Sequence, residues 1–340
     1  MFIVGGKFDN DGGKPSHFIS EMMKFLGCMG VNGGYVKDLS ADFGAFTDIL
    51  IWMPEVDNNE DKILPTIKVK NPHTILVQSK RISEGNYTES DVIGRLLKSH
   101  SLLGIAIEKL ESGYWFKLLD PLGNIHCSTD SLEILCSTLK KRVTKIKNMT
   151  RLGSKKVGPV KDFVIDKDFV EVVKKFGKQF STFVNAINPN RLLGNASTRC
   201  ASGFPAVKEG ERIFVSKRNV DKQTLCSKDF VEVSLPGECV EFYGDNKPSV
   251  DTPIQLLLFS YFPYIKYMIH GHVYVKNAPM TEHKIPCGFL EEVIDVLAVV
   301  NDAEVEEFSI NLRGHGCLVC CKDLSYFDKI EFVGRPFPES

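Results

Sequence analysis

Short apolar runs alternate with helical patterns through the first half of the chain. The runs at residues 2–4, 48–53 and 74–78 are rich in β-branched and aromatic residues and predict strands. Apolar residues recur with a helical period at 18–26 and 91–103, which predicts helices there. Alternation of this kind is typical of a sheet that is covered by helices.

The pattern changes after residue 103. Residues 104–119 predict a hairpin or strand pair, which ends in the turn sequence Asp-Pro-Leu-Gly-Asn at 120–124, and 131–141 predicts a helix. We assign residues 1–145 to a first α/β domain that is Rossmann-like or flavodoxin-like.

A basic segment follows the first domain. Residues 140–161 contain nine Lys or Arg and no acidic residue, with two glycines and a proline among them. We interpret 146–164 as a linker. A basic segment can bind an anion such as RNA, but this one has no aromatic residue for base stacking, so a solvated connector is preferred.

A long amphipathic pattern then opens a second domain, assigned to residues 165–338. Asp166 or Asp168 can cap the helix, and Pro189 ends it. The apolar residues recur at spacings of three and four and predict one broad helical face, made of Phe169, Val172, Val173, Phe176, Phe180, Phe183, Val184 and Ile187.

Composition excludes few classes of protein. A chain of 340 residues is expected to hold two domains, and 42 Lys plus Arg against 43 Asp plus Glu favour neither nucleic acid nor membrane as the main partner. No apolar run is long enough to span a bilayer and the N-terminus does not resemble a signal peptide, so we expect a cytoplasmic protein. The ten cysteines show no metal-knuckle spacing, and we expect them to be reduced.

Three histidines in the second half suggest a metal site. His270 and His272 lie two residues apart in a strand-like run, so both side chains can point to one face and reach one ion. His315 lies between two glycines at the mouth of another predicted strand. Taken alone, the first two are an ordinary surface or core pair and the third a turn residue. Together, three histidines leave a fourth position open, as a catalytic zinc site requires.

The order of motifs around these histidines resembles the class II aldolase/adducin family. It runs from Lys-Pro-Ser-Val-Asp at 247–251, through an apolar helical run, to the His-x-His strand and the later Gly-His-Gly. Leu-Gly-Asn-Ala-Ser at 193–197 and Ile-Phe-Val-Ser-Lys at 213–217 resemble the family's two phosphate loops. The resemblance covers residues 169–325 and implies a class II aldolase-like α/β/α domain.

The resemblance also implies roles for individual residues. His270, His272 and His315 would hold a divalent metal, with zinc favoured, and Asp251 would be the catalytic acid/base. Contacts to a phosphorylated substrate would come from Gly194, Asn195, Ser197, Ser216, Lys217 and Ser249.

The expected activity is that of a metal-dependent lyase or epimerase acting on a phosphorylated sugar or sugar nucleotide through a metal-stabilised enediolate. The family usually has Glu where this chain has Asp251, and the shorter side chain leaves cleavage, epimerisation and dehydration open. The alternatives are a non-catalytic, adducin-like scaffold and a bifunctional enzyme with a separate N-terminal activity.

The resemblance further implies a homotetramer, which we expect to use the surface of the 166–187 helix. Glu291 and Glu292 begin a predicted helix, where they either bind substrate or complement the helix dipole, and we favour the second role.

Glycine-rich segments in the first domain predict its ligand less specifically. Gly5-Gly6-Lys7 and the Gly-Gly-Lys-Pro-Ser segment at 12–16 lie between a predicted strand and helix, where phosphates often bind, but no standard nucleotide fingerprint is complete. Residues 32–34 and 79–81 are placed at or beyond strand ends. A nucleotide, flavin or phosphosugar site and a structural or partner-binding domain both stay open.

Overall fold

The computed structural model describes residues 2–6, 17–30, 32–39, 49–53, 63–71, 74–82, 89–111, 113–159, 163–184, 194–200 and 211–334. The contacts between residues divide the chain into two compact units, with the division between Asn148 and Met149. Within the described ranges, no helix is both long enough and apolar enough to cross a membrane.

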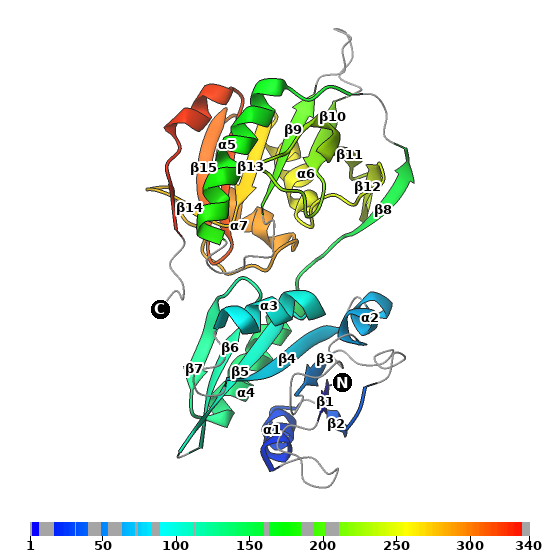
Figure 1. The fold of residues 1–340 in the computed structure, drawn as a ribbon, viewed down its shortest axis with the longest axis vertical. Helices are drawn as coiled ribbons and strands as arrows, with labels where there is room; N and C mark the ends of the chain where they lie inside the picture. The colour runs from blue at the N-terminus through cyan, green and yellow to red at the C-terminus, as the bar shows by residue number, and fades with distance from the viewer. Residues whose placement is uncertain are drawn as a thin grey trace. The chain divides into compact units, whose positions relative to one another are not determined.

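The described part of the first unit is a seven-stranded sheet with helices on both faces (Figure 1). The strands are ordered β2-β1-β3-β4-β5-β6-β7; β1 to β5 are parallel, and β6 and β7 are antiparallel to their neighbours. The elements are β1 (Phe2–Gly5), α1 (His17–Cys28), β2 (Gly33–Val36), β3 (Ile49–Trp52), α2 (Ile63–Lys70), β4 (Ile75–Ile82), α3 (Glu89–Ser99), β5 (Leu103–Leu110), β6 (Gly113–Leu119), β7 (Ile125–Thr129) and α4 (Leu132–Lys147).

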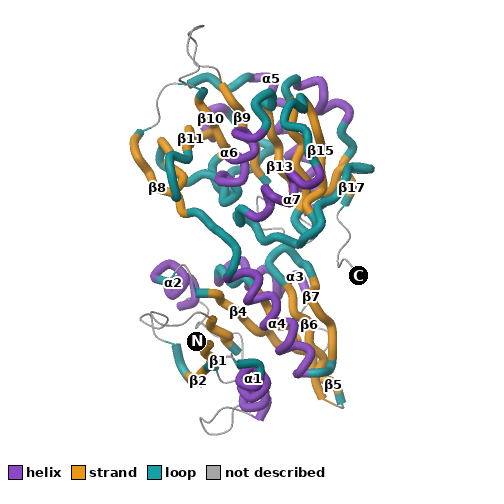
Figure 2. The backbone as a smooth tube through the Cα atoms, turned by 180° about the vertical axis from the view of Figure 1, so that it is seen from behind, coloured by secondary structure: helices purple, strands orange, loops and turns teal. Residues whose placement is uncertain are grey.

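The parallel part of this sheet has the flavodoxin-like order 2-1-3-4-5 rather than the Rossmann order. Helices α3 and α4 lie on opposite faces, as the two opposed views show (Figures 1 and 2). The hairpin predicted over 104–119 is confirmed as β5 and β6. The turn after it is held by Asp120, whose Oδ1 accepts the backbone N–H groups of Leu122 and Asn124 at 2.9 and 3.1 Å.

Two segments predicted to lie at or beyond strand ends are themselves strands. Gly33 and Gly34 pair in register with Phe2 and Ile3, and residues 79–81 continue β4 beside β5. The prediction was wrong because glycines and charged residues carry no apolar signal, whereas backbone pairing holds them in the sheet. The 12–16 segment lies outside the described residues, and the ligand of this unit stays a prediction.

The second unit is built on a mostly antiparallel, eight-stranded sheet, which is ordered β15-β16-β13-β9-β10-β11-β12-β8. Strands β14 and β17 form a separate, two-stranded antiparallel sheet. The elements are β8 (Gly153–Gly158), α5 (Lys167–Val184), β9 (Asn195–Cys200), β10 (Arg212–Ser216), η2 (Ser227–Asp229), β11 (Phe230–Ser234), β12 (Cys239–Tyr243), α6 (Thr252–Tyr261), β13 (Tyr267–Gly271), β14 (Tyr274–Val275), α7 (Glu291–Val299), β15 (Glu307–Leu312), β16 (Gly316–Cys321), η3 (Leu324–Lys329) and β17 (Phe332–Val333).

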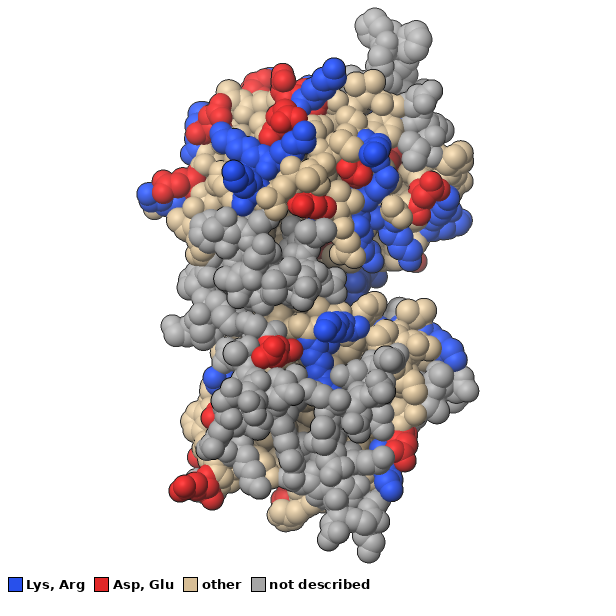
Figure 3. All heavy atoms as spheres, viewed as in Figure 1, with Lys and Arg blue, Asp and Glu red and all other residues tan. Residues whose placement is uncertain are grey.

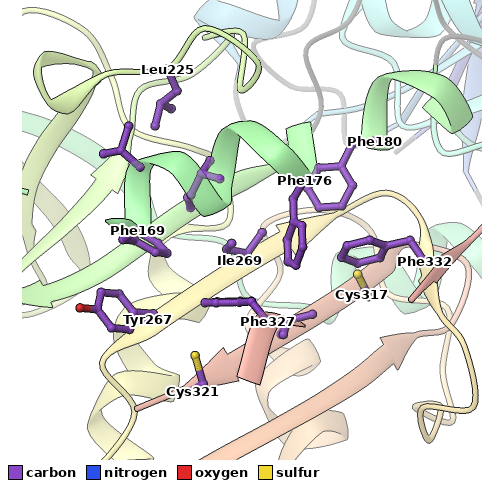
Figure 4. Close-up of a cluster of buried hydrophobic side chains, with 14 of the residues drawn as sticks. Phe169, Phe176, Phe180, Leu225, Tyr267, Ile269, Cys317, Cys321, Phe327 and Phe332 are labelled. Carbon is purple, nitrogen blue, oxygen red and sulfur yellow. The ribbon is translucent and has the colours of Figure 1, made fainter. Parts of the chain in front are cut away.

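Alternate residues of β13 enter two separate cores, which makes this unit a three-layer α/β/α structure. Tyr267 and Ile269 pack under α5 in an aromatic cluster (Figure 4), whereas Met268 packs on the other face with α6 and α7. The described part of the apolar face of α5 therefore packs within its own unit. The homotetramer and the use of this helix as its interface stay predictions.

The segment predicted to be a linker contains a strand. Residues 153–158 form β8, which pairs in parallel with β12 at the edge of the second sheet. Lys155 and Lys156 on this strand are exposed, and charged side chains of this kind discourage an edge strand from pairing with another chain. On the face that Figure 3 shows, Lys and Arg lie beside Asp and Glu over the second unit. Lys155 and Lys156 thus belong to a sheet edge rather than to a free connector.

Replacement of Phe176 by Ala should destabilise the second unit alone. Phe176 is 1% exposed and contacts Phe327 and Phe332, with ring centroids 5.4 and 4.7 Å away, so its loss should cost about 3–5 kcal/mol of unfolding free energy. Both tryptophans, Trp52 and Trp115, lie in the first unit. Urea unfolding followed by far-UV circular dichroism should therefore show an earlier transition, while the tryptophan fluorescence transition stays in place.

Val164→Ala is the matched control, because Val164 is 81% exposed and its truncation should change stability by less than about 0.5 kcal/mol. An equal shift of the fluorescence transition in Phe176→Ala would show that the two units unfold as one.

Candidate metal centre

His270 lies at the centre of the second sheet with one ring nitrogen available. It is the fourth residue of β13 and stands on the α6 and α7 face, between Asn195 of β9 and Leu318 of β16. Its Nδ1 lies 2.9 Å from the Cys317 carbonyl oxygen, which can only accept, so Nδ1 carries the hydrogen. The buried Nε2 has no hydrogen-bond partner among the described residues. A fixed, buried lone pair of this kind is what a metal ligand requires.

The environment keeps this imidazole neutral. Burial and the nearby His315 lower the pKa of His270 to about 4, although the carboxylate of Asp251 opposes the shift. At neutral pH the ring therefore presents a lone pair rather than a second N–H group.

Three imidazoles converge, but not by the strand geometry that we predicted. The strand ends at Gly271, and His272 follows it instead of occupying the next position of the same face. The ring centroids are 5.0 Å apart for His270 and His272, 4.7 Å for His270 and His315, and 5.0 Å for His272 and His315. One donor atom from each lies within 4.8 Å of the others, and all three residues are buried.

Glycines allow the His315 turn to reach the end of β13. A Cβ on Gly316, whose φ is +157°, would lie 2.0 Å from the Gly271 carbonyl oxygen and 2.8 Å from the His272 Cα. Similarly, a Cβ on Gly194 would lie 2.7 Å from the His270 carbonyl oxygen. Larger residues would push the β15–β16 turn and the start of β9 away from the histidines.

Glu292 orients His315, which corrects the helix-dipole role that we favoured. Its Oε1 lies 2.6 Å from His315 Nδ1, and both side chains are almost completely buried. Burial raises the pKa of Glu292, and the hydrogen bond with His315 opposes that shift. With Nδ1 held by the carboxylate, only Nε2 of His315 is directed at the centre. A carboxylate behind a ligating histidine is a common arrangement in metal sites.

Asp251 points its carboxylate at the histidines. It precedes α6, but its side chain makes no capping hydrogen bond to the helix. Its Oδ2 accepts from Asn195 Nδ2 at 3.3 Å and from Ser249 Oγ at 3.4 Å, and lies 3.9 Å from His270 Nε2. Its buried Oδ1 has no hydrogen-bond partner among the described residues. One oxygen is therefore held in place while the other is available for chemistry.

The residues predicted to contact phosphate fall into two groups. Gly194, Lys217 and Ser249 are partly exposed, although Lys217 Nζ donates to the Lys228 carbonyl oxygen at 2.6 Å. The remaining three are buried: Asn195, Ser197 and Ser216.

Two of the three buried residues, Ser216 and Asn195, make internal hydrogen bonds. Ser216 Oγ accepts from the Ala196 backbone N–H at 3.1 Å, and Asn195 Oδ1 accepts from Gln255 of α6. Ser197 is opposite Met268, two residues along β9 from Asn195. Asn195 and Ser216 thus support the site from within.

Sequence reasoning missed two further residues beside the centre. Cys287 Sγ lies 3.1 Å from His315 Nε2, and burial raises the pKa of its thiol. Lys222 is only 5% exposed; burial lowers its pKa to about 8, while Asp221 and Asp251 oppose that shift. Its charge acts on both Asp251 and His270. Neither residue belongs to a motif with a recognisable spacing, so no sequence signal marked them.

The donor set fits a divalent ion of the zinc type. Three imidazole nitrogens are borderline ligands, which suit zinc. Without an ion, the Nε2 of His270 would be a buried polar atom with no hydrogen-bond partner among the described residues, at a free-energy cost.

Glu292→Gln should weaken metal binding without removing a ligand. The amide keeps the size of the carboxylate but not its charge, so the affinity for zinc should fall about 10–100-fold. Competition with a chromogenic chelator would measure this. Glu291→Gln is the matched control, because Glu291 accepts instead from the Thr150 backbone N–H at 2.7 Å. Equal affinities in the two variants would contradict the role of Glu292.

Comparisons with known proteins find one family that is similar to part of the chain. Residues 190–325 match the model of the Class II Aldolase and Adducin N-terminal domain. No curated protein matches the chain.

Solved structures resemble each unit in part. YgbL from Klebsiella pneumoniae, a candidate aldolase/epimerase/decarboxylase, is 15% identical over 48% of this chain and 81% of its own, with a TM-score of 0.34. The N-terminal class II aldolase domain of a Thermoplasma acidophilum protein is 17% identical over 48% of this chain and 87% of its own, with a TM-score of 0.31. A DNA/pantothenate metabolism flavoprotein from Streptococcus pneumoniae is 11% identical over 43% of this chain and 98% of its own, also with a TM-score of 0.31. Residues 190–325, within the second unit, are thus similar to the Class II Aldolase and Adducin N-terminal domain.

Proposed function

We propose that the second unit is a metal-dependent lyase or epimerase that acts on a phosphorylated sugar or sugar nucleotide. The observation that supports this most is the pair of buried, partnerless atoms at the centre, His270 Nε2 and Asp251 Oδ1. A structural protein gains nothing from such atoms, because each is costly to bury without a partner. A metal ligand and a proton-transferring carboxylate both require them.

His270, His272 and His315 would hold the ion, and three neutral nitrogen ligands favour zinc. When bound, the ion would supply Lewis-acid chemistry, which stabilises negative charge on a substrate oxygen. Glu292 would keep His315 in the tautomer that presents Nε2.

Asp251 would move the proton. Asn195 and Ser249 hold its Oδ2, so Oδ1 can accept a proton from the substrate and return it without a change of rotamer. The buried Lys222 interacts electrostatically with this carboxylate. This arrangement serves cleavage, epimerisation and dehydration alike.

A phosphate group would be bound where the site is accessible. Ser249, the backbone around Gly194 and Lys217 are the partly exposed members of the predicted phosphate-binding set. The hydroxyl and N–H groups there are suitable donors for an anion. The buried Asn195 and Ser216 would affect substrate binding through the positions of Asp251 and β9.

His315→Ala and Asp251→Asn should separate metal binding from chemistry. Loss of one imidazole leaves two histidine ligands, so His315→Ala should purify largely free of metal and inactive. Asp251→Asn should keep its metal while turnover falls on the order of 10²-fold or more, because an amide cannot exchange the proton. Elemental analysis and an assay on a panel of phosphorylated ketoses would measure both effects.

His283→Ala is the control for a lost imidazole, because His283 is half-exposed and bonded to Asp295 away from the centre. A wild-type protein that binds no stoichiometric divalent ion would favour the adducin-like scaffold. Full turnover in Asp251→Asn would remove Asp251 as the acid/base.

A further inference from the structure

The loop before α7 holds a cysteine against the metal centre. Cys287 lies between Ile285 and Phe289, which are buried and anchor the loop on both sides. Gly288 has a φ of +80°, and a Cβ on it would lie 2.9 Å from the Val250 carbonyl oxygen. The loop is therefore packed against the residue before Asp251, and the position of Cys287 is fixed by its neighbours.

The thiol of Cys287 lies close to Nε2 of His315, the nitrogen that would bind the metal. Cys287 Sγ is 3.1 Å from His315 Nε2, and Glu292 already occupies Nδ1 of the same ring. The thiol hydrogen bond and a metal bond would use the same lone pair. An ion that binds to Nε2 would thus lie next to the sulfur.

A second donor set includes this sulfur. Donor atoms of Asp251, Cys287 and His315 lie within 4.8 Å of one another, as those of the three histidines do. His315 is common to both sets. The partnerless His270 Nε2 and Asp251 Oδ1 are independent signs that a ligand belongs at this point.

We propose that Cys287 is the fourth protein ligand of the resting metal centre, an inference that rests on the proposed metal site. In a tetrahedral zinc site with bonds of about 2.0–2.1 Å to nitrogen and 2.3 Å to sulfur, the two ligand atoms lie roughly 3.5 Å apart. The observed 3.1 Å between Cys287 Sγ and His315 Nε2 is close to that separation, so an ion on Nε2 would have the sulfur within reach. Binding of the ion releases the thiol proton to solvent, and the thiolate completes the coordination.

A fourth protein ligand changes how substrate enters. Three histidines and a thiolate form a closed, four-coordinate centre, so a substrate oxygen must either displace the sulfur or add as a fifth ligand. Cys287 is partly exposed, unlike the three histidines, which are buried. The thiolate would also favour zinc and cobalt over manganese and magnesium.

Cobalt(II) is a suitable probe because a cobalt–thiolate bond gives an intense charge-transfer band in the near ultraviolet, separate from the weak visible bands of the ion. The full-length protein with one equivalent of cobalt should show both the charge-transfer band and the visible bands. Cys287→Ser should keep the visible bands, lose the charge-transfer band and bind zinc at least about 10-fold more weakly. Cys239→Ser, on strand β12 next to the edge strand β8, is the control and should match the wild type.

The outcomes distinguish the two proposals. Cobalt bound by the wild type with visible bands but no charge-transfer band, or an unchanged band in Cys287→Ser, would overturn the role of Cys287 and leave the histidine site intact. Failure of the wild type to bind cobalt would overturn the metal site itself. Circular dichroism of each variant would confirm that a lost band does not reflect unfolding.

Discussion

The central constraint in the second unit is the antiparallel pairing of β13 with β9 on one side and β16 on the other. Because the three strands are held in one register, Asn195 lies opposite His270, and the Cys317 carbonyl oxygen accepts from the His270 ring. The β15–β16 turn then brings His315 to the end of β13. A shift of one residue along β13 would turn His270 toward the aromatic core under α5 and disassemble the site.

This constraint explains why so many polar groups can be buried in one place. His270, His315, Asp251 and Glu292 are each less than 10% exposed, and isolated charges at such depth are unfavourable. Asn195 and Ser249 hold Asp251, the Cys317 carbonyl oxygen holds His270, and Glu292 holds His315. Among the described residues, His270 Nε2 and Asp251 Oδ1 have no hydrogen-bond partner. The cost of burying these groups is offset by the two apolar layers on either side of the sheet.

The accuracy of the sequence predictions depended on the range of the interaction involved. The hairpin over 104–119 and the helix that begins near Asp166 were predictable, because strand and helix periods are local. The end predicted for that helix, at Ile187 and Pro189, lies outside the described residues. By contrast, β2 and β8 were missed, since glycine-rich and lysine-rich segments become strands only through pairing with β1 and β12.

The sequence by itself indicated a candidate metal site, because the residue types and order of the His-x-His, Gly-His-Gly and Pro-Ser-x-Asp motifs carry chemistry that does not depend on packing. Only the tertiary structure decided how that chemistry is supported. Glu292, Lys222 and Cys287 come from segments that no motif marks, and they reach the centre because α7, its preceding loop and the loop after β10 pack around it. Such contacts join residues that are distant in the chain, so their partners follow from the path of the backbone through the folded unit rather than from any spacing in the sequence.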